Sequence, residues 1–79
     1  MSSEKTLEEV ILSEKNPIIK AQFLNHYFKK LEKENGKPEQ YAFASRQYLI
    51  LYKLLNAKSP ELGEIFSHKM IYCEEKSRL

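Results

Sequence analysis

Cysteine and glycine are scarce in this 79-residue chain, which contains one cysteine, Cys73, and two glycines, Gly36 and Gly63. A single cysteine cannot form a disulfide within the chain and leaves a thiolate metal site short of ligands. The two glycines stand alone, outside any glycine-rich motif of the kind that holds phosphate groups. These shortages exclude an intrachain disulfide and a glycine-loop nucleotide site.

Long hydrophobic runs are also missing. The longest uninterrupted apolar run, Tyr48 to Tyr52, is far too short to span a bilayer. Residues 1–9 lack the apolar core of a secretory signal. We therefore expect a cytoplasmic protein without a membrane partner, although export by a route that needs no cleaved signal stays open.

The composition is that of an ordinary helical globular protein, with 42% apolar and 30% charged residues. The formal net charge of +2 is too small to indicate a class of partner. We expect one domain over residues 1–79, with frayed ends at 1–5 and 76–79. A chain this short buries only about 60% of its unfolded surface, so apolar residues beyond the small core would favour self-association or a partner.

The most apolar stretch, residues 41–55, predicts a central helix. At 100° per residue its apolar side chains cover an arc of about 200°, interrupted only by Gln47. Such an arc is wider than one buried stripe, so other helices should cover it on more than one side. A buried strand over residues 48–52 is the competing interpretation, but the apolar run continues beyond strand length without Gly or Pro.

Capping signals place the other helix boundaries. Thr6 and Glu9 have the spacing of a capping box and predict a short helix over about 6–15, which either docks or acts as a latch that orders only on binding. Asn16-Pro17 predicts the start of an amphipathic helix over about 17–34. Gly36 is expected to provide its left-handed C-cap, before Pro38 opens the central helix over 38–55.

Ser59-Pro60 predicts the start of a last helix, over about 60–75. Its apolar stripe consists of Leu62, Phe66, Met70 and Cys73. Gly63 either allows a neighbouring helix to approach closely or is merely tolerated. The sequence thus predicts an all-α fold, a small antiparallel helical bundle of three main helices preceded by a short one, although a swapped dimer fits the same pattern.

Candidate catalytic and metal-binding groups are few. Acidic residues and one histidine share the polar face of the last helix: Glu61, Glu64, His68 and Glu75. One helix alone does not supply the converging ligands of a zinc or di-iron site. His26 is expected to be a surface histidine and Cys73 a small core residue. We therefore predict no enzyme activity, no metal and no cofactor.

Positive residues on the second and third helices form a candidate nucleic-acid site. Its proposed members are Lys29, Lys30, Lys33 and Arg46. Such a strip could hold phosphate groups if the two helices aligned it. Glu32 and Glu34 interrupt the lysines, and no helix-turn-helix pattern is visible, so a solvated charged face is the competing interpretation.

Tyrosines along one edge of the central helix are the candidate partner-binding residues. Tyr41, Tyr48 and Tyr52 lie within about 40° of one another, and Leu55 is next to them. Tyrosine is common in interfaces because its ring is apolar and its hydroxyl is polar. The same residues could instead pack at the rim of the monomer core.

Together these patterns favour a small non-enzymatic module for protein–protein interaction. An adaptor, an inhibitor or a regulatory subunit all fit, acting as a monomer or a homodimer with a protein partner that the sequence does not identify. The alternative is a regulator that binds nucleic acid through the basic strip.

Overall fold

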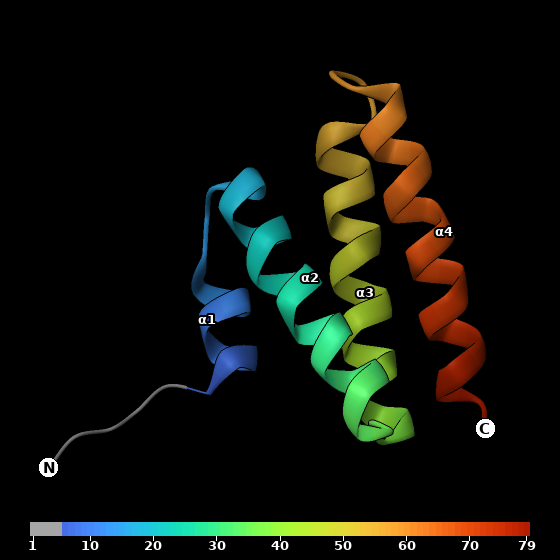
Figure 1. The fold of residues 1–79 in the computed structure, drawn as a ribbon. Coiled ribbons are helices and arrows are strands. Elements are labelled where there is room, and N and C mark those ends of the chain that lie inside the picture. Colours follow the sequence, from blue (N-terminus) through green and yellow to red (C-terminus); the bar gives the residue numbers. More distant parts are fainter. Residues whose placement is uncertain (1–5) are drawn as a thin grey trace, which may run out of the picture.

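The computed structural model describes residues 6–79, which form four α-helices and no strands (Figure 1). The helices are α1 (Leu7–Ser13), α2 (Pro17–Glu34), α3 (Pro38–Leu55) and α4 (Pro60–Ser77). The predicted all-α bundle with a short first helix is therefore confirmed. The first helix is shorter than expected, and α4 continues through residues 76 and 77, which were expected to be frayed. The frayed start expected at residues 1–5 lies outside the described residues.

Capping side chains fix where the helices begin. The Thr6 hydroxyl accepts a hydrogen bond from the Glu9 N–H at 3.2 Å, and the Glu9 carboxylate accepts one from the Thr6 N–H at 3.1 Å. The side chains of Asn16 and Ser59 also accept hydrogen bonds from backbone N–H groups in the first turns of α2 and α4. α2, α3 and α4 each begin with proline, whose missing N–H costs nothing at the first helical position.

The end of α2 differs from the prediction at one residue. Asn35, not Gly36, occupies the left-handed region, with a φ of 54°. Asparagine tolerates this region better than most residues because its short polar side chain can bond locally. Gly36 is needed for space instead, since a Cβ atom on it would lie 2.6 Å from Cδ2 of Leu31.

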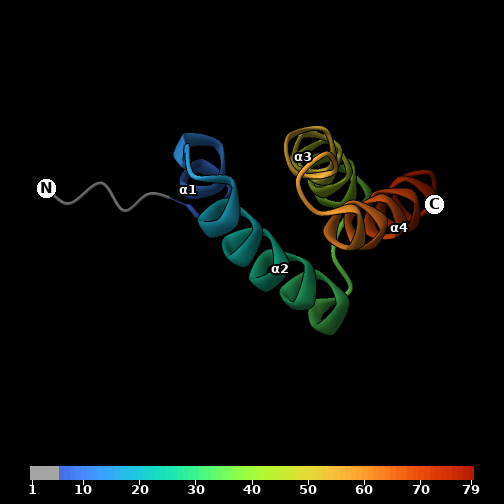
Figure 2. The same ribbon diagram turned by 90° about the horizontal axis from the view of Figure 1, so that it is seen from above.

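The helices are arranged in chain order, with successive long helices antiparallel (Figure 1). Among the described helices, close backbone contacts join only consecutive ones, and the most extensive packing is between α3 and α4. Seen from above, α2 runs obliquely to the α3–α4 pair and does not lie along α4 (Figure 2). The resulting shape is flat, with extents of 42 × 31 × 16 Å. Side chains alone therefore bridge the space between α2 and α4.

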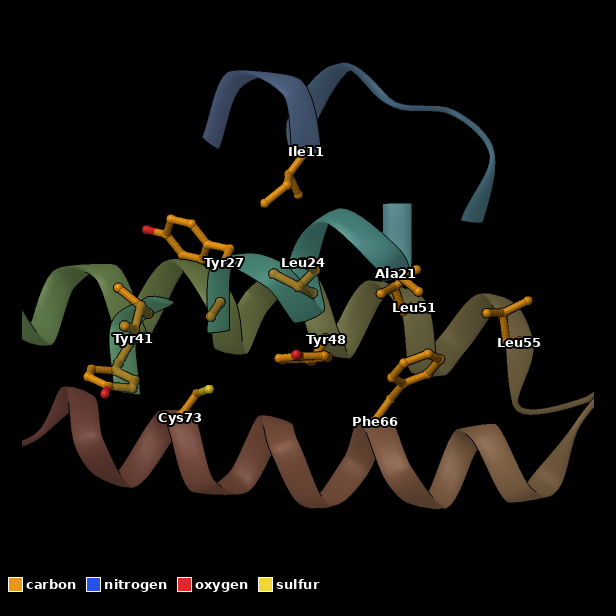
Figure 3. Packing of buried hydrophobic residues seen from close by; sticks show 12 residues of the cluster. Ile11, Ala21, Leu24, Tyr27, Tyr41, Tyr48, Leu51, Leu55, Phe66 and Cys73 are labelled. Carbon is orange, nitrogen blue, oxygen red and sulfur yellow. The ribbon is translucent and has the colours of Figure 1, made fainter. Parts of the chain in front are cut away.

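The core lies around α3, as its broad apolar arc predicts (Figure 3). Five buried apolar residues come from this helix: Tyr41, Ala44, Tyr48, Leu51 and Leu55. α2 covers one flank and α4 another, but Ile50 and Leu54 on the apolar arc remain 41% and 53% exposed. Gln47, which interrupts the arc in the sequence, is buried, and its Oε1 has no hydrogen-bond partner in residues 6–79.

Gly63 of α4 lies close to the Asn56 side chain. A Cβ atom at this position would lie 2.2 Å from Oδ1 of Asn56 and 3.0 Å from its Cβ. The glycine therefore provides space for the Asn56 side chain, which directly follows α3, rather than for a neighbouring helix.

Candidate functional site

Two tyrosines of the predicted edge, Tyr41 and Tyr48, contact side chains of both α2 and α4. Tyr41, Tyr48 and Leu55 are buried, while Tyr52 is half-buried. The Tyr48 ring stacks on Phe66 of α4 with centroids 6.0 Å apart, and its hydroxyl donates a hydrogen bond to Asn25 of α2 at 2.8 Å. Their partner-binding role stays a prediction, which the positions of Tyr41 and Tyr48 do not favour because the chain's own helices cover these two rings.

Glu32 anchors one end of the space between α2 and α4. Its carboxylate accepts hydrogen bonds from the Tyr41 and Tyr72 hydroxyls, each at 2.6 Å. The Lys76 ammonium lies over both rings, 5.8 Å and 5.7 Å from their centroids. The bonds from Tyr41 and then Tyr72 lower the pKa of Glu32, and Lys76 lowers it further. We call these four residues the Glu32 cluster.

At the other end, side chains do not fill the space between α2 and α4. A groove of about 370 Å³ lies here, and its lining consists of Ile18, Ala21, Gln22, Asn25, Leu55, Leu62, Ile65, Phe66 and Lys69. We call it the α2–α4 groove. Leu55 and Phe66 are buried at its floor, whereas Ile18 and Ile65 on its two sides are 49% and 47% exposed. The start of α2, the end of α3 and the start of α4 all lie at this end of the molecule (Figure 1).

The boundary between the two ends is polar. Oδ1 of Asn25 accepts hydrogen bonds from the Tyr48 hydroxyl at 2.8 Å and from the Lys69 ammonium at 3.0 Å. Lys69 also lies over the Phe28 and Tyr48 rings, 5.5 Å and 5.8 Å from their centroids. These contacts place a half-buried positive charge at the inner end of a mostly apolar groove.

The candidate basic strip is only partly assembled. Lys29, Lys30 and Lys33 are exposed on α2, where with His26 they line a shallow hollow. Arg46 is exposed on α3 and does not line this hollow. The structure therefore groups three of the four predicted residues.

The candidate chemical groups of α4 remain separate. Glu61, Glu64, His68 and Glu75 are all exposed, and residues 6–79 contain no group of three His, Cys, Asp or Glu side chains placed to hold a metal ion. Cys73 is fully buried, and burial raises the pKa of its thiol to about 12. A thiol this basic is protonated at neutral pH, so it is a poor nucleophile.

Comparison of the chain with protein-family models, with curated proteins and with solved structures finds no match. None of the helices in residues 6–79 has the length and hydropathy needed to cross a membrane.

The groove was not predicted from the sequence, although a signal for it exists. Ile18 and Ile65 lie off the main apolar stripes of their helices. An apolar residue off the stripe is often a harmless surface residue. Here the two face the same space, and only the packing of α2 and α4 against α3 brings them together.

Proposed function

We propose that this protein is a non-catalytic interaction module that binds a helical segment of a partner protein in the α2–α4 groove. The observation that carries this proposal is an apolar floor of buried Leu55 and Phe66 between half-exposed Ile18 and Ile65. An amphipathic helix that lays its apolar face into a hydrophobic groove is a recurrent mode of recognition. Of the four residues predicted to bind a partner, Leu55 lines the groove.

Two isoleucines of α4 provide a matched test. Ile65 and Ile71 belong to the same helix and are 47% and 46% exposed, but only Ile65 lines the groove. We expect the wild-type protein and the Ile71→Ser variant to capture the same partner. The Ile65→Ser variant should not capture it. The measurement is affinity capture with all three proteins, followed by mass spectrometry, with circular dichroism to verify that each is folded.

Equal capture by the three proteins would contradict the proposal. Assembly of the chain with itself is distinguished by sedimentation of the purified protein. A dimer that Ile65→Ser dissociates and Ile71→Ser preserves would make a second copy the occupant of the groove.

Nucleic-acid binding is the second candidate function, supported by the grouping of Lys29, Lys30 and Lys33 with His26. Contacts to phosphate groups release counterions, so this function requires an affinity that falls steeply with salt. The test is fluorescence anisotropy of a labelled oligonucleotide from 50 to 200 mM salt. Absence of binding at low salt would contradict it.

A further inference from the structure

Lys69 places a half-buried ammonium, which has no carboxylate partner within residues 6–79, at the α2–α4 groove. Within residues 6–79 no Asp or Glu oxygen lies within 4.0 Å of it, and Arg78 with Glu74 forms the one ion pair of that part of the chain. An ammonium has three N–H donors, and Asn25 accepts from one of them. The other two donors of Lys69 have no hydrogen-bond acceptor within residues 6–79.

The surroundings of Lys69 add a second positive charge, and they compensate its own charge with the Asn25 oxygen and two aromatic rings rather than with a carboxylate. Burial lowers the pKa of Lys69, and the nearby charge of Lys29 lowers it further. The Asn25 oxygen that accepts from Lys69 also accepts from Tyr48, so it has no further lone pair to offer. An anion placed here would be favoured by both ammonium groups in a partly desolvated site.

We propose that the segment bound in the α2–α4 groove is an amphipathic helix with a carboxylate that pairs with Lys69 and with apolar residues that cover the groove floor. This inference rests on the proposed function and names the partner's chemistry. Charge complementarity and the apolar floor support it together. A nucleic-acid backbone could satisfy Lys69 but would leave the apolar floor uncovered.

The spacing along α4 sets the pattern expected in the partner. Ile65 and Lys69 are four residues apart and Leu62 and Lys69 are seven apart. At 1.5 Å per residue these separations are about 6 Å and about 10 Å along the helix axis. A partner helix that lies along α4 places its Asp or Glu one to two turns from its apolar anchors.

The test uses the full chain as bait for a display library of helix-biased 16-residue peptides. We expect the wild-type protein and Ile71→Ser to select peptides with an apolar pair and an Asp or Glu one to two turns away. Ile65→Ser should select none of these peptides. Lys69→Met should select apolar peptides without the acidic preference.

A synthetic copy of a selected peptide then measures the pair by titration calorimetry. We expect Lys69→Met to weaken binding about tenfold, which is about 1.4 kcal/mol. Replacing the peptide's Glu by Gln should cost the same, and the two changes together should cost no more than either alone. Lys69→Arg should retain most of the affinity. If Lys69→Met does not fold, Lys29→Met is the substitute, with an expected loss of about twofold.

The outcomes separate this inference from the proposed function. Peptides that need Ile65 but show no acidic preference and bind Lys69→Met normally would overturn the inference and leave the groove as a binding site. A library that yields no peptide dependent on Ile65 would overturn both. Acidic peptides that depend on Lys69 would support both.

Discussion

The two ends of the space between α2 and α4 differ in the side chains that meet there. At one end, Glu32 of α2 reaches the Tyr41 and Tyr72 hydroxyls, so long polar and aromatic side chains close the gap. At the other end, α2 contributes Ala21 and Ile18, and an apolar groove remains. Backbone contact joins α2 and α4 at neither end. The two ends therefore differ both in the length of the side chains that meet there and in the course of α2, whose end is joined to α3 by a short turn.

The largest expected effect comes from Tyr48, which lies between the two ends and is fully buried. Tyr48→Ala should destabilise the protein by about 3 to 5 kcal/mol, because it leaves a cavity beside Phe66 and removes the donor to Asn25. A chain of this length has a total stability of only about 4 to 12 kcal/mol, so the variant should lose a large share of it and melt well below the wild type.

Urea unfolding measures this loss, and Tyr48→Phe is the matched control. The control keeps the ring and removes only the hydroxyl bond, at a cost of about 0.5 to 1.5 kcal/mol. If Tyr48→Ala were as stable as Tyr48→Phe, packing of the Tyr48 ring would not contribute to the stability of the fold.

The second effect concerns Gly63, at the open end. Alanine has a helix propensity better than glycine by up to about 1 kcal/mol, but its Cβ would clash with Asn56. Overpacking typically costs about 1 to 3 kcal/mol, so we expect Gly63→Ala to lower the melting temperature. Gly63→Ala combined with Asn56→Gly should recover stability, because the clashing side chain is gone. A single Gly63→Ala variant that melts higher than the wild type would mean that Asn56 rotates away without cost.

The smallest effect concerns the closed end and depends on pH. The folded state lowers the pKa of Glu32 below the ordinary value of 4.5. The unfolded chain therefore takes up a proton at higher pH than the folded chain does. The contribution of Glu32 is fully present above the ordinary carboxyl pKa and is lost as the pH falls through the lowered value.

Glu32→Gln should thus reduce stability at pH 7 by a modest amount, because the carboxylate is largely exposed and screened by solvent. Thermal melts of both proteins between pH 3 and pH 7 should converge toward the acidic end. If the difference in melting temperature between the two proteins stays the same across this pH range, Glu32 is not the source of the pH dependence. The substitution should leave peptide selection by the α2–α4 groove unchanged, because Glu32 does not line it.

Most of the helix boundaries could be predicted because they depend on local chemistry. The capping box at Thr6, the caps at Asn16 and Ser59, and the prolines that follow them act within a few residues. The cap after α2 was the exception. Asn35 and Gly36 are adjacent, and both residue types tolerate the left-handed region. In the structure Asn35 adopts it, and Gly36 lies where a side chain would contact Leu31.

The candidate site was harder to predict because several faces of the chain are apolar. Tyr41 and Tyr48 have the amphipathic chemistry of interface residues, but α4 covers them and Glu32 and Asn25 satisfy their hydroxyls. Ile18 and Ile65 carry no such chemical signal. They become a candidate site because nothing in residues 6–79 fills the space between them.

The sequence by itself determined that residues 6–79 form four helices and where these begin, because capping, proline geometry and apolar periodicity are local properties. It also determined that the arc on α3 is too broad for one neighbour to cover. Only the tertiary structure decided which part of that arc is buried, which lysine faces an apolar groove and which tyrosines are enclosed. These depend on how α2 crosses α3 and on the lengths of side chains that meet across a gap, and neither is encoded in any single segment.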